Sequence, residues 1–113
     1  MIQNAMSVAM AEVIAQRFHL LADPTRIRIL DALRGNPLTV GALTDEIGTS
    51  QQNISKHLGL LHRAGIVARE KDGVCVHYRI ADDTVFELCE EVCGGIHRHL
   101  NGLQTMMDEG VAR

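Results

Sequence analysis

The sequence predicts a mainly α protein with a small β-hairpin, arranged as a winged helix-turn-helix in the order α-α-α-α-β-β-α. Two changes of apolar spacing carry this prediction. Apolar residues recur at steps of three and four up to residue 65 and again after residue 82, which is typical of amphipathic helices. Between residues 66 and 80 they recur at steps of two, which is typical of strands. Aromatic residues form only 3% of the chain and Trp is absent, so the core is expected to be aliphatic.

The first two helices are predicted from this spacing and from start and stop signals. Residues 5–21 form the first amphipathic stretch. Asp23 is a candidate N-cap for the second helix, and Pro24 suits its first helical position. Gly35 is expected to end the second helix. The apolar face of that helix is expected to consist of Ile27, Leu30 and Leu33.

Two short helices follow, separated by a Gly-Thr-Ser turn. Thr39 or a near neighbour is expected to open the first of them, and Gly48 to end it. Thr49 or Ser50 is expected to cap the second, and Gly65 to stop it. Two short consecutive helices with a tight turn between them, followed by a hairpin, indicate a helix-turn-helix with a wing.

Two strand-like segments form the predicted wing, IVAREK at residues 66–71 and VCVHYRI at residues 74–80. Asp72 and Gly73 join them and are a strong two-residue hairpin signal. One of residues 82–84 is then expected to cap a long last helix. The apolar stripe of this helix is expected to comprise Val85, Cys89, Val92, Ile96, Leu100, Leu103 and Met107.

Length, charge and cysteine usage narrow the class of protein. A chain of 113 residues suits one domain, and no apolar run approaches the roughly 18 residues that a membrane span needs. The three cysteines are expected to be thiols in a reducing cytoplasm. The net charge of −3 is unevenly distributed, because residues 56–79 carry +3 and residues 81–113 carry −5. No catalytic constellation is evident, so an enzyme is not expected.

The second short helix begins SQQNISKH at residues 50–57, with polar and basic side chains and no acid. Gln pairs with adenine edges, Ser contacts bases or phosphate, and Lys56 neutralises phosphate. The hairpin tip adds the cations Arg69 and Lys71. A merely solvated polar face is the alternative. The adjoining turn, the preceding short helix and the hairpin favour DNA reading.

Four motifs occur in one order over roughly residues 15–100: the helix start ADPTR, the helix SQ-x-x-IS-x-HL, the exit L-x-x-AGIV and the hairpin DG-x-x-x-x-YRI. Together they resemble the ArsR/SmtB-type winged-helix transcriptional repressors. His57 either contacts DNA or is a structural residue on the inner side of its helix. The DNA contacts that the resemblance implies are Ser50, Gln51, Gln52, Ser55, Lys56 and His57, with Arg69 and Lys71 on the wing.

The same resemblance implies a homodimer that binds a palindromic operator and releases it when an inducer, often a metal ion, is bound. Residues 1–113 then form a single winged-helix DNA-binding domain. Its dimerisation helices are expected at residues 5–22 and 83–108, its helix-turn-helix at residues 38–65 and its wing at residues 66–80.

Family members differ in where the inducer binds, and two of their site patterns are missing from this sequence. An arsenic-type thiol site would need cysteines near residues 40–45, where there are none. A zinc site on the last helix would need ligands at positions that Gly95 and Arg98 occupy.

The last helix offers two thiols instead. Cys89 and Cys93 stand one helical turn apart, so both thiolates can converge on one soft ion, and His97 extends the row. The candidate ions are Zn, Cd, Hg, Cu(I) and As(III). Cys75 on the hairpin is a candidate additional thiol.

Four alternatives stay open. The same cysteines suit a repressor that senses redox species or persulfides, or they simply pack like small apolar residues. A further alternative is a winged-helix regulator without a small-molecule sensor. The last alternative, from another class of protein, is a helical interaction module that does not bind DNA.

Overall fold

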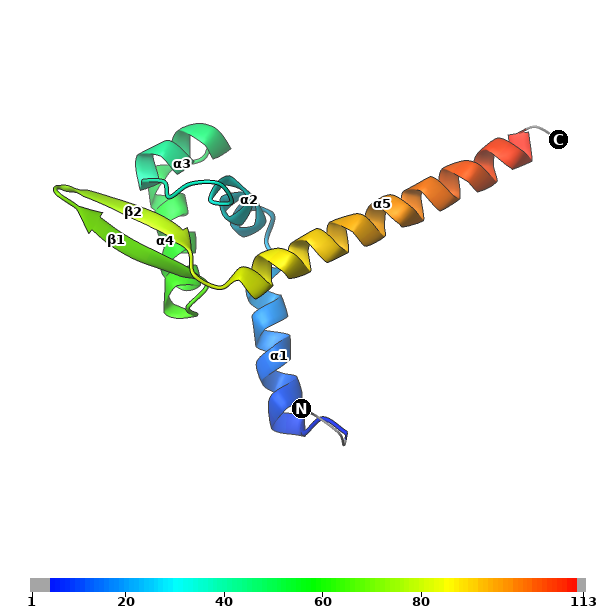
Figure 1. Ribbon diagram of the computed structural model, residues 1–113, viewed down its shortest axis with the longest axis horizontal. Coiled ribbons are helices and arrows are strands. Elements are labelled where there is room, and N and C mark those ends of the chain that lie inside the picture. The colour runs from blue at the N-terminus through cyan, green and yellow to red at the C-terminus, as the bar shows by residue number, and fades with distance from the viewer. Residues whose placement is uncertain (1–4, 112–113) are drawn as a thin grey trace. The chain divides into compact units, whose positions relative to one another are not determined.

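The computed structural model describes residues 5–111, with side chains up to residue 108, and this part of the chain contains five helices and one antiparallel hairpin (Figure 1). The chain divides into two compact units, one ending at Asp82 and one beginning at Asp83. The elements are α1 (Val8–Leu21), α2 (Pro24–Ala32), α3 (Val40–Ile47), α4 (Gln51–Arg63), β1 (Val67–Asp72), β2 (Cys75–Ile80) and α5 (Asp83–Val111). Their order confirms the predicted winged helix-turn-helix.

Each of the first four helices begins at a side-chain N-cap. The oxygens of Asp23, Thr39 and Ser50 accept hydrogen bonds from backbone N–H groups three residues on, as predicted for the starts of α2, α3 and α4. The start of α1 was predicted too early. Ser7 caps it by accepting from the Met10 N–H at 3.0 Å, so residues 5–7 lie outside the helix.

The helix ends follow glycine at two of the three predicted positions. Gly48 and Gly65 adopt φ values of 81° and 77°, the left-handed conformation in which a side chain would be strained. The predicted stop at Gly35 is wrong, because α2 already ends at Ala32.

The core of the first unit is aliphatic, as the composition indicates. On α2 the predicted apolar face needs one correction, because Ile27 is 44% exposed and Ile29 is fully buried. The α4 side chains Ile54, Leu58 and Leu61 are fully buried as well. The other fully buried side chains are Leu30, Leu43, Ile66 and Val67.

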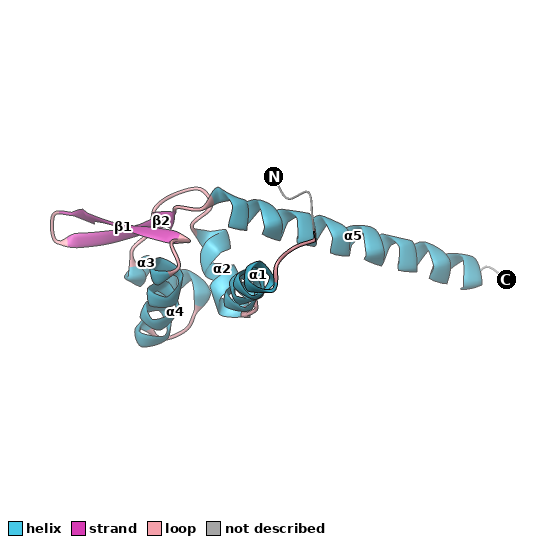
Figure 2. Cartoon of the chain, turned by 90° about the horizontal axis from the view of Figure 1, so that it is seen from below, coloured by secondary structure: helices cyan, strands magenta, loops and turns pink. Residues whose placement is uncertain are grey.

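The hairpin shows a turn one residue later than predicted. Asp72 pairs with Cys75, so the two loop residues are Gly73 and Val74 rather than Asp72 and Gly73. Figure 2 shows β1 and β2 side by side with the short loop that joins them. Gly73 has a φ of 65°, which a two-residue turn with Gly in its first position requires. At its base the hairpin is extended by a bridge to Leu38, whose N–H donates to the Tyr78 carbonyl at 3.0 Å and whose carbonyl accepts from the Tyr78 N–H at 2.8 Å.

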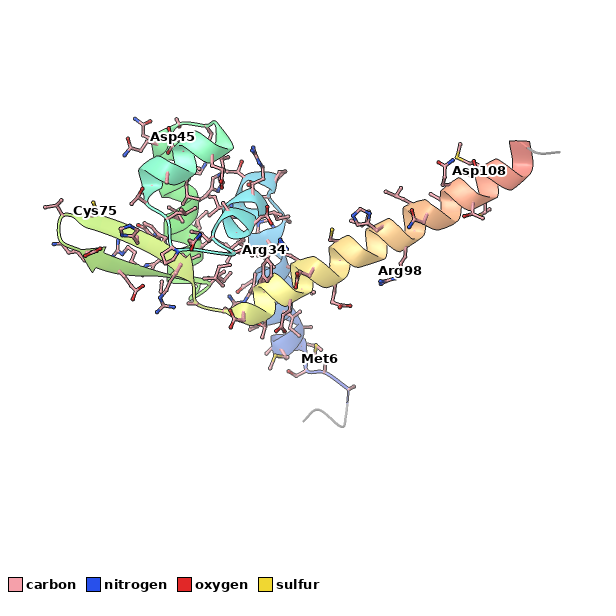
Figure 3. All side chains as sticks on the ribbon, turned by 45° about the horizontal axis from the view of Figure 1, so that its top comes forward. Met6, Arg34, Asp45, Cys75, Arg98 and Asp108 are labelled. Atoms are coloured by element: carbon pink, nitrogen blue, oxygen red, sulfur yellow. The ribbon has the colours of Figure 1, made fainter. Side chains whose placement is uncertain are left out.

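The second unit is the single 29-residue helix α5. Its apolar stripe is largely exposed, with Ile96 and Leu100 each at 54%. Arg98 lies midway along the helix (Figure 3) and folds back, its guanidinium 3.4 Å from the position that a Cβ would take at Gly94. None of the described helices is both long and apolar enough to cross a membrane.

Candidate DNA interface and thiol pair

Helix α4 presents a polar, acid-free surface at its N-terminal end. The side chains of Ser50, Gln51, Gln52, Ser55 and Lys56 are all exposed. Ser50 also accepts from the Asn53 N–H at 3.1 Å and so fixes the first turn. Amide and hydroxyl groups with one cation at a positive helix end form a surface that suits base edges and phosphates.

Asn53 lies beside this surface and was not singled out in the sequence. Its Nδ2 donates to the Thr49 hydroxyl at 3.1 Å, which leaves its carbonyl oxygen available as an acceptor. The SQQN run already contained the signal, since Asn is a base-reading side chain, but its half-buried position was visible only in the fold.

His57 does not belong to the exposed surface, which corrects its inclusion among the DNA contacts. Its side chain is 6% exposed, and its Nδ1 lies 3.0 Å from the Arg26 guanidinium. Its Nε2 lies 4.0 Å from the Asp23 carboxylate. Burial lowers the pKa of His57; Asp23 opposes this, and the cations Arg26 and Lys56 add to it. The hydrogen bond from the Arg26 N–H lowers the pKa of Asp23.

The wing separates its cations between two faces. Arg69 and Lys71 are exposed and lie on the same face of β1, two residues apart. On the opposite face Arg79 donates to the Glu70 carboxylate at 3.1 Å, so this third cation is already neutralised. Arg69 and Lys71 are therefore the wing cations that remain available to bind a polyanion.

Two of the three thiols lie on α5 and the third lies on the wing. Cys93 is exposed and Cys89 is half-buried one turn before it on α5, while Cys75 lies near the tip of the wing (Figure 3). Burial raises the pKa of the Cys89 thiol. His97 is exposed one further turn along α5. Within the described residues no group of three or more Cys, His, Asp or Glu side chains is close enough to hold a metal ion.

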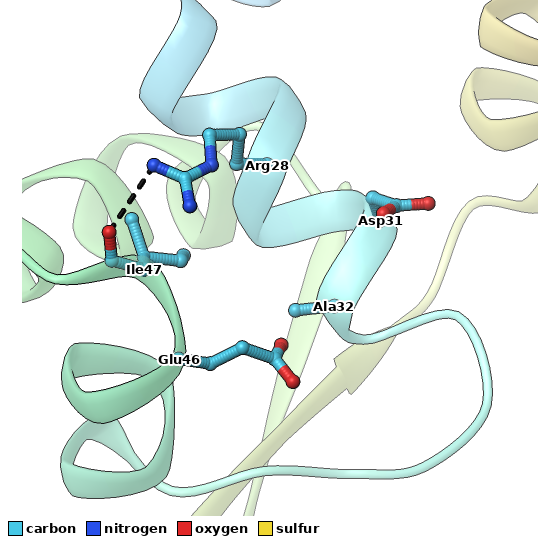
Figure 4. Close-up of a pocket in the computed structure, with 5 residues that line it drawn as sticks. All are labelled: Arg28, Asp31, Ala32, Glu46 and Ile47. Carbon is cyan, nitrogen blue, oxygen red and sulfur yellow. Dashed lines mark hydrogen bonds between the residues drawn. The ribbon is translucent and has the colours of Figure 1, made fainter.

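A polar hollow between α2 and α3 is occupied by structural contacts. Arg28 donates to the Ile47 carbonyl at 3.1 Å and satisfies the last turn of α3 (Figure 4). Glu46 and Asp31 line the same hollow, and Asp31 also lies 3.6 Å from Arg34. The Arg28 hydrogen bond is therefore the contact that joins α2 to α3 in this hollow.

Comparison with known proteins places these features in a family. Residues 21–70 match a family described as a helix-turn-helix domain. Over 75 residues the chain is 43% identical to the uncharacterized HTH-type transcriptional regulator Rv0081 of Mycobacterium tuberculosis, a match that spans 66% of each chain, just under two thirds. It is 30% identical over 104 residues to the HTH-type transcriptional regulator KmtR of the same organism, covering 83% of this chain and 80% of the relative.

Solved structures agree with this relationship. The crystal structure of Rv0081 matches with a TM-score of 0.77 and 36% identity, over 84% of this chain and 96% of that one. The antimony-specific transcriptional repressor AntR matches with a TM-score of 0.78 and 30% identity, over 88% and 90%. The homodimeric winged helix-turn-helix domain Mb0332 of Mycobacterium bovis, described as a possible ArsR-family regulator, matches with a TM-score of 0.74 and 28% identity, over 88% and 94%. With its helix-turn-helix, its wing and these relatives, the chain belongs to the ArsR/SmtB family of winged helix-turn-helix transcriptional regulators.

Proposed function

We propose that this protein is a dimeric repressor that binds a palindromic DNA operator and releases it when a soft metal or metalloid ion binds thiols on α5. The observation that carries the DNA-binding part is the exposed, acid-free end of α4 with free cations on the neighbouring wing. In this proposal Gln51 and Gln52 read bases, while Ser50, Ser55 and Lys56 contact bases or phosphate. Arg69 and Lys71 bind phosphates along the backbone.

The dimer is supported by apolar surface that the described chain leaves exposed. On α1 the side chains of Val13 and Phe18 are 60% and 52% exposed, and on α5 a stripe through Ile96 and Leu100 is similarly open. Contiguous apolar faces of this kind mark interaction surfaces. A second copy of the chain would cover them and would place two α4 helices on two half-sites.

The thiol pair supports the sensor part. Cβ atoms one turn apart on a helix lie about 6 Å from each other, which lets two sulfurs approach one ion with M–S bonds of roughly 2.3 Å. Because the described chain brings no third ligand to the pair, the proposal requires a ligand from the second subunit. His97 is the nearest candidate on α5.

The protonation state of Cys89 favours metal over redox chemistry. Burial raises the pKa of Cys89, so this group is a thiol near neutral pH and is a poor nucleophile. A soft ion displaces the thiol proton directly, and its binding then becomes tighter as the pH rises. Thiol oxidation or persulfide formation would depend on the exposed Cys93.

The test is DNA release by the wild type, by the Cys89→Ser/Cys93→Ser double variant and by Cys75→Ser as a matched control. The probe is a duplex that the wild type selects from a random library, followed by fluorescence anisotropy. We expect Zn²⁺, Cd²⁺ or arsenite to release the wild type and Cys75→Ser but not the double variant. Thiolate-to-metal absorption should appear only where both cysteines are present.

Each other outcome contradicts a different part of the proposal. Release of the double variant by the same ion would mean that Cys89 and Cys93 only pack. Release of the wild type by a persulfide but by no ion would favour the redox alternative. A wild type that binds DNA and responds to nothing would indicate a regulator without a small-molecule sensor. A wild type that binds no DNA would indicate an interaction module.

A further inference from the structure

A closed set of polar contacts connects the end of α1, the start of α2 and the middle of α4. Arg26, on the first turns of α2, donates through Nε to the Leu20 carbonyl in the last turn of α1. Through its other arm it lies 3.0 Å from His57 Nδ1 on α4. Its own backbone N–H donates to Asp23 at 3.1 Å, and Asp23 in turn faces the second nitrogen of His57.

The chemistry of Arg26 determines the tautomer of His57. A guanidinium has only donors, so His57 Nδ1 must be the acceptor of this bond and the ring proton must reside on Nε2. That N–H then points toward the Asp23 carboxylate at 4.0 Å. Nδ1 is thereby hydrogen-bonded and Nε2 faces the carboxylate, so a flipped imidazole would turn its N–H donor toward the Arg26 guanidinium.

A second arginine forms a hydrogen bond with α4 near its C-terminal end. Arg17, on α1, donates to the Ala64 carbonyl at the C-cap of α4 at 3.1 Å. His57 and Ala64 are seven residues apart, which is about 10 Å along a helix axis. Two bonded positions at this spacing limit both the rotation and the sliding of α4. Each position is connected to α1 through an arginine.

We propose that Arg26 is a positioning residue that couples the orientation of the recognition helix α4 to the end of α1. The inference rests on the proposed function, which assigns α1 to the dimer interface and α4 to DNA. Lys56 precedes His57 directly on the same helix, so the imidazole that Arg26 holds sets where the adjoining polar face points. A shift of α1 in the dimer thereby changes the angle at which Gln51 and Gln52 meet the bases.

The test separates positioning from charge and from overall stability. Arg26→Lys keeps the charge but lacks the fork that reaches both Leu20 and His57. His57→Leu removes the acceptor, and His57→Gln restores one. Arg28→Lys is the matched control, because Arg28 also lies on α2 and also donates to a carbonyl of another helix, Ile47 on α3.

The measurement is the ratio of affinities for a duplex selected by the wild type and for a shuffled duplex, with circular dichroism confirming that each variant is folded. We expect Arg26→Lys and His57→Leu to lower this ratio roughly tenfold, while affinity for the shuffled duplex and its salt dependence stay as in the wild type. His57→Gln should recover most of the ratio. Arg28→Lys should leave it unchanged.

Two outcomes would overturn the inference, and they are distinguishable from failure of the proposed function. Wild-type ratios in Arg26→Lys and His57→Leu would show that these contacts do not orient α4. An equal loss of affinity for both duplexes would show a general structural effect instead of positioning. If the wild type itself enriches no sequence, the proposed function fails and the inference falls with it.

Discussion

The salt dependence of DNA binding tests the assignment of the cations on α4 and the wing. Lys56, Arg69 and Lys71 are exposed, which gives six candidate phosphate contacts in a dimer. At about 0.9 counterions released per contact, log K should fall with log salt at a slope of about −5.4. Raising salt from 50 to 200 mM should then weaken binding by about 10³-fold.

Substituting Lys56→Ala removes two of these six contacts per dimer. The slope should become shallower by about 1.8, so the same salt step should weaken binding by only about 150-fold. The matched control is Arg79→Ala, because the Arg79 guanidinium is already bonded to Glu70 at 3.1 Å and should release few counterions. Fluorescence anisotropy titrations at four or more salt concentrations give both slopes. A wild-type slope in Lys56→Ala, together with a shallower one in Arg79→Ala, would refute the assignment.

Three further predictions concern stability and assembly. The stability that neutral His57 contributes should be present above the ordinary histidine pKa of 6.5, and should be lost as the pH falls from there through the lower pKa of the folded state. Urea unfolding of His57→Gln should therefore depend less on pH in this range than unfolding of the wild type. An unchanged pH profile would contradict the prediction. Gly48→Ala should lower the free energy of unfolding by roughly 1–2 kcal/mol because of its φ of 81°, whereas Gly35→Ala, in open space, should change it by less than about 0.5 kcal/mol in the same urea assay. Leu100→Glu should weaken self-association roughly 100-fold or more in sedimentation velocity, while Asn101→Glu should not; dimers of equal strength would place the interface elsewhere.

The local part of the fold was predictable because its signals are local. Asp23, Thr39 and Ser50 cap their helices by bonding to backbone N–H groups only three residues later in the sequence. Gly48 ends α3 through its own backbone angle. The hairpin turn was predicted one residue early because two turn signals competed there. Asp-Gly and Gly-Val are both acceptable two-residue turns, and the alternation of apolar residues leaves both registers open until the partner strand is known.

The candidate site was predictable only as far as exposure follows from helical spacing. The polar end of α4 could be read from its sequence, but the burial of His57 depends on Arg26, which is 31 residues away. The two thiols could be located on α5 from helical spacing alone. The described residues place no third Cys, His, Asp or Glu side chain close enough to the pair to complete a metal site, so the sequence pattern of one chain does not define the ligand set of the proposed site.

The bridge between Leu38 and Tyr78 fixes the wing near its base and leaves its tip unsupported. Two backbone hydrogen bonds hold the hairpin at Tyr78, and Val74, four residues farther along at about 3.3 Å each, lies at the tip with 98% of its surface exposed. We expect the roughly 13 Å of hairpin beyond Tyr78 to bend more easily than its base, so that the tip and not α4 adjusts to the shape of bound DNA.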